Sequence, residues 1–163
     1  MSTTYELLLE RLSSFNLEKD RYWDNLATMV AKLPQSYRLF LGLSEPGWQN
    51  PDGSVHSYVQ LGIGIGDAFV GQRAQLLSGT DEATLPFTLK LTLNPETPTQ
   101  SSEELFFSIS AKEGPNAYVF FVNGLEKPVQ VGLSEGDSGQ FDPLWSALTE
   151  LGYRWFDPEI FTN

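Results

Sequence analysis

The sequence predicts a single α+β domain over residues 1–163, with N-terminal helices, an antiparallel sheet of about five or six strands and a C-terminal helix. Three observations support this fold class. Apolar residues recur at helical spacing before Pro34 and at a spacing of two after it. The connections between the alternating segments are short, which favours antiparallel neighbours. The regular strand–helix alternation of a doubly wound sheet is missing.

Residues 1–33 are predicted to form a helical hairpin or one long kinked helix. Thr3 and Glu6 match a capping box, in which each side chain satisfies a backbone N–H of the first turn. Pro34 is expected to end the second helix, because the residue before a proline is disfavoured in the α region. Both helices are expected to lie on the sheet through two apolar stripes. These stripes consist of Tyr5, Leu8, Leu9, Leu12 and Phe15, and of Tyr22, Leu26, Met29, Val30 and Leu33.

Residues 37–133 are predicted to form the sheet. The alternation over 37–43 predicts its first strand, and residues 85–93 show the clearest alternation of the chain. Asn123-Gly124 indicates a type I′ hairpin, since both positions of that turn need a positive φ. Other strands are expected over 55–65, 105–109, 118–122 and 125–133.

Two glycine-containing segments leave alternatives open. Gly62, Gly64 and Gly66 would leave one face of a strand as bare backbone. Close packing of a helix or an aromatic side chain, or a sharp bend, is a better explanation than a phosphate cradle, which needs a βαβ unit. Residues 66–80 fit a short helix capped by Asp67 or an irregular segment equally well.

A terminal helix is predicted over residues 142–152. Asp142 would cap it, Pro143 would occupy its first position and Gly152 would follow its last turn. The aromatic tail 153–156 is expected to dock on the sheet.

The charge is distributed unevenly along the chain. Residues 1–33 hold five acids and four bases, whereas residues 34–163 hold sixteen acids and six bases, for a net charge of −11. An acidic surface of this kind repels nucleic acid and anionic membranes and attracts basic proteins. No apolar run reaches the length of a membrane span. The first residues carry no basic region or cleavage site, so a cytoplasmic location is expected.

The motifs with catalytic potential are incomplete. Gly132-Leu133-Ser134-Glu135-Gly136 matches the G-x-S-x-G pattern, but loop residues follow it and the sole histidine, His56, lies upstream. A surface turn explains Ser134 better than a hydrolase nucleophile does. The absence of cysteine and the single histidine argue against a transition-metal site. We therefore expect no enzymatic activity and no cofactor.

The remaining functional hypothesis is protein binding. The leading interpretation is a domain that neutralises or masks a basic partner, such as an immunity protein for a toxic effector. The alternative is an accessory chaperone for a secreted effector; type III secretion chaperones are similar in size, charge and fold class, although no motif is shared. A homodimer through the N-terminal helices is a further hypothesis. The predicted partner-binding residues are Glu103, Glu104, Glu135, Asp137 and Asp142, with Trp48 and Trp155 as apolar anchors.

Overall fold

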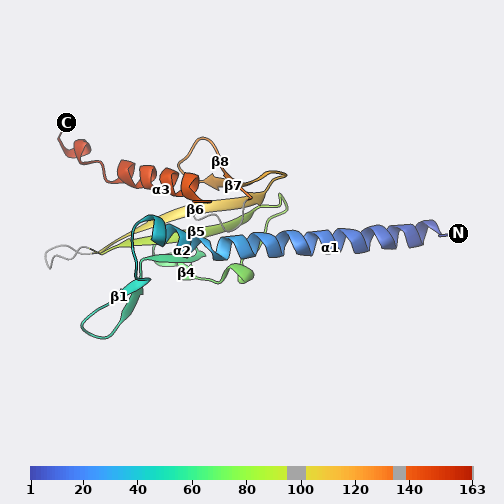
Figure 1. Ribbon diagram of the computed structural model, residues 1–163, viewed down its shortest axis with the longest axis horizontal. Coiled ribbons are helices and arrows are strands. Elements are labelled where there is room, and N and C mark those ends of the chain that lie inside the picture. The colour runs from blue at the N-terminus through green and yellow to red at the C-terminus, as the bar shows by residue number, and fades with distance from the viewer. Residues whose placement is uncertain (95–101, 134–138, 163) are drawn as a thin grey trace.

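The computed structural model describes residues 1–94, 102–133 and 139–162 and has the predicted α+β fold (Figure 1). Its six-stranded antiparallel sheet has the order β4-β3-β5-β6-β7-β8, and β1 and β2 form a separate hairpin. The strands are β1 (Gly47–Gln49), β2 (Val55–Ser57), β3 (Val59–Ile63), β4 (Val70–Gly71), β5 (Leu85–Leu93), β6 (Glu103–Glu113), β7 (Ala117–Val122) and β8 (Val129–Gly132). The helices are α1 (Thr4–Ala31), α2 (Leu33–Phe40) and α3 (Asp142–Trp155), with short 3₁₀ turns η1 (Gly66–Ala68), η2 (Ala74–Leu76) and η3 (Pro158–Phe161).

Of the two forms predicted for the N-terminal segment, a helical hairpin and one long kinked helix, the structure has the bent helix. The capping box is present: the Glu6 N–H donates to Thr3 Oγ1 and the Thr3 N–H donates to Glu6 Oε2, both at 3.1 Å. The helix runs without a break to Ala31 and resumes as α2 at Leu33. The prediction that Pro34 ends the helix was wrong. Pro34 lies in the first turn of α2, where a missing N–H has no cost.

The strand predicted over residues 37–43 was also wrong, because α2 covers most of it. Of the alternating apolar residues there, Tyr37 is buried but Leu39 is 56% exposed. The alternation arises because Tyr37 faces the core while Leu39 lies on the outer side of a short helix. The sheet region therefore starts with the β1–β2 hairpin at Gly47.

The core lies between the three helices and one face of the sheet. The alternate residues Leu85, Phe87, Leu89 and Leu91 of β5 are all buried on this face. Across neighbouring strands, Leu89 pairs with Phe107 of β6, and Ala111 of β6 pairs with Phe120 of β7. The helices contribute the buried residues Leu26, Met29, Val30, Leu33, Tyr37, Leu144, Trp145, Leu148 and Leu151.

The connections differ from the predictions in three places. Gly124 has a φ of +101°, but Asn123 is not among the described residues with positive φ, so a type I′ turn is not formed. Six residues connect β7 to β8. Residues 66–80 form two 3₁₀ turns and the short β4 rather than one α-helix. Helix α3 continues past Gly152, which is buried inside it, to Trp155.

The alternating glycines are explained by close packing and by a bend. A Cβ atom on Gly62 would lie 2.7 Å from the ring of Phe69, which covers this strand from the segment that follows. Gly64 and Gly66 have φ values of +81° and +58°, so the chain turns sharply after β3. An aromatic side chain, not an N-terminal helix, therefore covers the bare backbone.

Tyr22 joins α1 to the sheet through its hydroxyl group. The hydroxyl donates to the carbonyl oxygen of Ala83 and accepts from the Glu113 N–H at 3.2 Å. Burial raises the pKa of Tyr22 above its usual value, although the hydrogen bond from Glu113 opposes this. The neutral form is thus favoured in the folded protein, and this contribution to stability is lost as the pH rises above about 10.

Replacement of Tyr22 with phenylalanine is expected to lower the free energy of unfolding by about 1–2 kcal/mol, because two backbone groups each lose a partner. Urea unfolding at neutral pH measures this change. The matched control is Tyr153→Phe, since Tyr153 is 68% exposed and its hydroxyl should contribute less than about 0.5 kcal/mol. Equal values for the two variants would show that the Tyr22 hydrogen bonds do not stabilise the junction.

Candidate protein-binding surface

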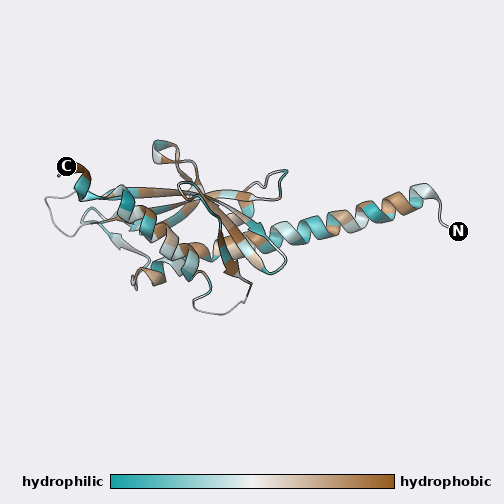
Figure 2. Cartoon of the chain, turned by 90° about the horizontal axis from the view of Figure 1, so that it is seen from above, coloured by the Kyte–Doolittle hydropathy of each residue, from teal (hydrophilic) through white to brown (hydrophobic). Residues whose placement is uncertain are grey.

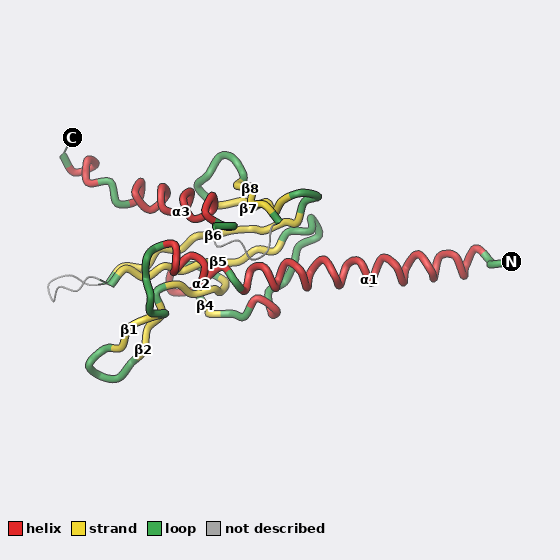
Figure 3. Tube along the Cα trace, in the orientation of Figure 1, coloured by secondary structure: helices red, strands yellow, loops and turns green. Residues whose placement is uncertain are grey.

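Acidic and aromatic side chains are exposed at the end of the molecule where β5 stops and β6 starts. The C-terminus lies toward this end and the N-terminus of α1 lies at the opposite end (Figure 3). The exposed apolar residues here are Trp155, Phe156, Ile160 and Phe161. Together with Glu103, Glu104, Asp157 and Glu159, they are called the C-terminal end surface below.

Two contacts hold the end of α3 over the first half of β6. The Trp155 ring stacks on Phe107, with centroids 5.2 Å apart and planes 22° apart. A methyl group of Leu105 lies 3.7 Å from where a Cβ atom on Gly152 would be. Glu103 shares the face of Leu105 and Phe107, because alternate residues of a strand point to the same side. Glu103 is therefore presented on the α3 side of the sheet.

The aromatic tail is only partly docked. Trp155 forms the predicted contact with the sheet but remains 44% exposed. Phe161, in the 3₁₀ turn that Asp157 caps, is 85% exposed. Large apolar side chains exposed together beside polar groups are typical of protein-interaction surfaces.

Most carboxylates of the described residues have no cationic partner. Within those residues, only Glu18 and Glu104 form ion pairs, with Arg21 at 2.8 Å and with Lys90 at 3.7 Å. The Lys90 ammonium also lies 5.0 Å from the centre of the Phe69 ring. Glu103, Asp157 and Glu159 thus have no cationic partner at the C-terminal end surface.

The structure brings four of the seven predicted partner-binding residues to one end of the sheet. Glu103 and Trp155 lie on the α3 side of this end, whereas Glu104 lies at the same end on the other face of the sheet, where it pairs with Lys90. Trp48 lies in the β1–β2 hairpin at the same end. Its ring centroid is 4.9 Å from that of Tyr58. The Tyr58 carbonyl in turn accepts a hydrogen bond from the Thr92 N–H near the end of β5. Thr92 pairs with Glu104 across β5 and β6.

The other three predicted residues do not join this group. Asp142 begins α3, and the C-terminal end surface lies at the other end of that helix. Glu135 and Asp137 lie outside the described residues, as does Ser134. Phe156 was not predicted as a partner-binding residue because the tail 153–156 was expected to dock, and no role was predicted for Ile160 and Phe161. The sequence did contain a signal for these exposed residues, because apolar residues continue past Gly152 at positions that do not fit the spacing of another helix.

Among the described residues, His56 belongs to a hydrogen-bonding network of the β1–β2 hairpin. Its ring stacks on Trp48 at 5.2 Å, and its Nε2 lies 2.9 Å from Asn50 Nδ2 and 3.3 Å from Ser54 Oγ. Ser54 donates its hydroxyl proton to Asp52 at 2.6 Å, and its N–H donates to the same oxygen. These hydrogen bonds lower the pKa of Asp52. A triad would need the carboxylate on the histidine instead.

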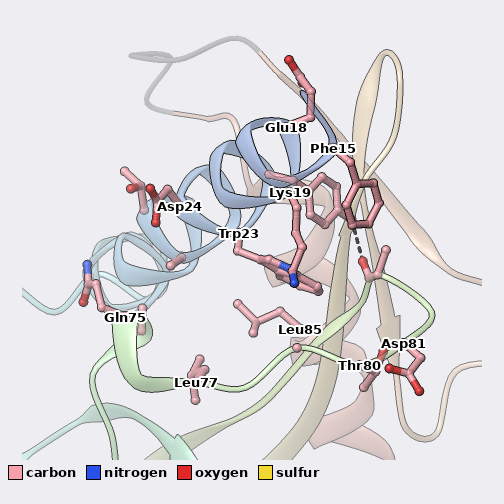
Figure 4. A pocket seen from close by; sticks show the side chains of 16 residues that line it. Phe15, Glu18, Lys19, Trp23, Asp24, Gln75, Leu77, Thr80, Asp81 and Leu85 are labelled. Atoms are coloured by element: carbon pink, nitrogen blue, oxygen red, sulfur yellow. Dashed lines mark hydrogen bonds between the residues drawn. The ribbon is translucent and has the colours of Figure 1, made fainter. Parts of the chain in front are cut away.

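A second surface feature lies where α1 leaves the sheet. A groove of about 1090 Å³ separates α1 from the segment 74–85, and Figure 4 shows Trp23 pointing from the helix into it. A Cβ atom on Gly79 would lie 2.2 Å from the Trp23 ring, so the segment passes directly under the indole. Glu18, Asp24 and Asp81 line the groove beside a single cation, Lys19.

The described ranges contain neither a metal-binding cluster nor a membrane-spanning helix. No three acidic or histidine side chains there are placed to hold a metal ion, and no helix there has the length and apolarity to cross a bilayer. Comparisons with family models, curated proteins and solved structures found no match to this chain.

Proposed function

We propose that this protein is a non-enzymatic, acidic protein-binding domain that masks a basic partner, as an immunity protein masks a toxic effector. The observation that carries the proposal is the C-terminal end surface, where exposed aromatic side chains lie at the same end of the molecule as Glu103, Asp157 and Glu159, three carboxylates without an ion pair. Aromatic side chains at an interface supply most of the binding energy, and complementary charge accelerates the encounter. Occlusion of the partner's active surface would be sufficient for inhibition. The proposal includes a cytoplasmic location, where such an effector would act.

Affinity capture from the native source tests this function. The chain is used as bait beside a Glu103→Lys/Glu159→Lys variant and a matched Asp81→Lys/Glu82→Lys variant. The control reverses the same number of charges at the other end of β5, where both residues are exposed. A basic protein should be captured by the wild type and by the control, and lost or strongly reduced with the first variant. Equal capture by both variants would place the binding surface elsewhere.

An accessory chaperone for a secreted effector is the second candidate. The projecting part of α1 favours it, because a helix with an uncovered apolar stripe can hold another chain. The two functions differ in the state of the partner that is bound. An immunity protein binds a folded effector, whereas a chaperone binds a segment that is unfolded, so protease sensitivity of the captured partner separates them.

A further inference from the structure

The N-terminal part of α1 carries an apolar stripe that nothing in the described chain covers. In this stripe, Tyr5, Leu8, Leu12 and Phe15 are 53–70% exposed. The same stripe continues at Tyr22, Leu26 and Met29, where the helix lies on the sheet and Leu26 is fully buried. Figure 2 shows these apolar bands on the part of α1 that extends beyond the sheet.

The spacing of this stripe is that of a coiled coil. Tyr5, Leu12, Lys19 and Leu26 are seven residues apart, and Leu8, Phe15, Tyr22 and Met29 form the second seven-residue series. These two series are the a and d positions of a heptad repeat, which pack against another helix. Lys19 is the single charged residue among them.

We propose that a second copy of this chain covers the stripe, so that the two α1 helices pack antiparallel over residues 5–22. The sheet, which α1 contacts from Tyr22 onward, limits the length of helix that can pair in this way. Beyond Tyr22 the same helix face is buried against the protein's own sheet, as the 4% exposure of Met29 shows. The stretch from Tyr5 to Tyr22, which is half-buried at the edge of the sheet, is about 27 Å long at 1.5 Å per residue, is equal for both copies and is self-complementary.

Apart from a register that overlaps only residues 5–8, the heptad allows three antiparallel registers, and charge and burial select one. In the first, Tyr5 lies opposite the partner's Phe15, and Arg11 of each copy faces Arg11 of the other. In the third, Tyr5 lies opposite the partner's Met29, which the sheet already covers. In the second, Tyr5 lies opposite the partner's Tyr22.

In this second register, Lys19 of each copy lies opposite the partner's Leu8, and the other pairs are favourable. Leu12 of each copy meets the partner's Phe15. Arg11 lies beside the partner's Glu18, and this pair occurs twice because the arrangement is symmetric. Glu18 binds Arg21 of its own helix through Oε2 and has a second oxygen for Arg11.

A parallel pair is unfavourable for two electrostatic reasons. Lys19 would face Lys19 at the centre of the interface, and two bodies with a net charge of −11 per chain would lie side by side. The antiparallel pair places the bodies at opposite ends. The first turn of each helix then reaches the groove beside Trp23 of the other copy (Figure 4).

The area is adequate for a specific dimer. Each copy contributes Tyr5 and Phe15, which are 70% and 61% exposed, and the leucines Leu8 and Leu12. A buried aromatic side chain covers about 150–250 Å², so the two copies together reach about the 1,000 Å² that a specific interface needs. The dimer is independent of the proposed function. It would place two C-terminal end surfaces at opposite ends of one particle.

Light scattering after size-exclusion chromatography tests the dimer at about 100 μM protein, where micromolar association is essentially complete. The wild type is expected at twice the mass of one chain, and Leu12→Asp should weaken association by at least about 100-fold because both copies lose an apolar contact. The matched control is Leu17→Asp: Leu17 is 70% exposed on the opposite side of the helix, and its variant should remain dimeric. A monomeric wild type, or equal behaviour of the two variants, overturns the proposal.

Charge exchange and a distance measurement test the register. Arg11→Glu and Glu18→Arg should each weaken the dimer, whereas the double variant should restore it. A spin label introduced at Ser2 should give a distance between copies of about 35 Å in the antiparallel register, because 23 residues separate the labels along the helix axis. A parallel pair would give less than half of this distance. Failure of the double variant to restore association, or the short distance, overturns the antiparallel register.

Discussion

Replacing Trp145 with alanine is expected to lower the free energy of unfolding by about 3–5 kcal/mol, the usual cost of removing a fully buried large aromatic side chain. Trp145 has no exposed surface and lies on α3 where that helix meets α2. Its ring meets Tyr37 edge-on, with centroids 4.6 Å apart, and Phe141 packs on its other side at 6.2 Å. Its indole Nε1–H donates to Ser36 Oγ at 2.9 Å. Loss of the ring would therefore leave a cavity between the helices and an unpaired hydroxyl.

Two control variants separate packing from hydrogen bonding. Ser36→Ala removes only the hydrogen bond and should cost about 1 kcal/mol. Trp48→Ala removes an indole of equal size from the partly exposed β1–β2 hairpin and should cost much less than Trp145→Ala. Chemical denaturation followed by far-UV circular dichroism gives all three values. Similar losses for the two tryptophans would contradict the placement of Trp145 in the core.

Replacing Phe161 with alanine is expected to weaken binding of the basic partner by about 30-fold or more, which corresponds to about 2 kcal/mol. Phe161 is 85% exposed and makes no core contact, so its removal should leave the free energy of unfolding almost unchanged. An aromatic ring that is exposed in the free protein can contribute its full burial energy on binding. Calorimetry with the captured partner measures the affinity.

Leu76→Ala is the matched control for this substitution. Leu76 is 62% exposed but lies in the 3₁₀ turn beside α1, away from the C-terminal end surface. Its variant should bind the partner with wild-type affinity. If the partner binds Phe161→Ala as tightly as it binds the wild type, the aromatic tail is not an anchor.

Local sequence patterns predicted the parts of the fold that depend on neighbouring residues. The capping box at Thr3 and the strand 85–93 are present as predicted because short-range hydrogen bonding and alternation determine them. The 37–43 segment was misassigned because apolar residues that lie two positions apart on a short helix can have the same spacing as those of a strand. The sequence left a hairpin and one long helix both possible, because Ser13, Ser14 and Asn16 are poor helix formers; they occupy exposed positions, where a helix tolerates them.

The candidate surface was predictable only in part. Negative charge and single aromatic residues were visible in the sequence, but their common location depends on the pairing of β5 with β6 and on the docking of Trp155 on Phe107. The paired residues of β5 and β6 are 10 to 26 positions apart, and Trp155 and Phe107 are 48 positions apart. Similarly, both stripes of α1 were identified, but only the structure shows that the sheet covers the second stripe and leaves the first one exposed.

The proposed function is tested most directly by the association rate of the captured partner, measured by stopped flow at low and at high salt. Binding guided by the C-terminal end surface predicts a fast rate that falls steeply as salt is added, because screening removes the attraction between opposite charges. The Glu103→Lys/Glu159→Lys variant should associate more slowly at low salt, and its rate should depend less on salt. The Asp81→Lys/Glu82→Lys control should retain most of the wild-type rate. An association rate that is indifferent to salt, or equal for the two variants, would contradict the account.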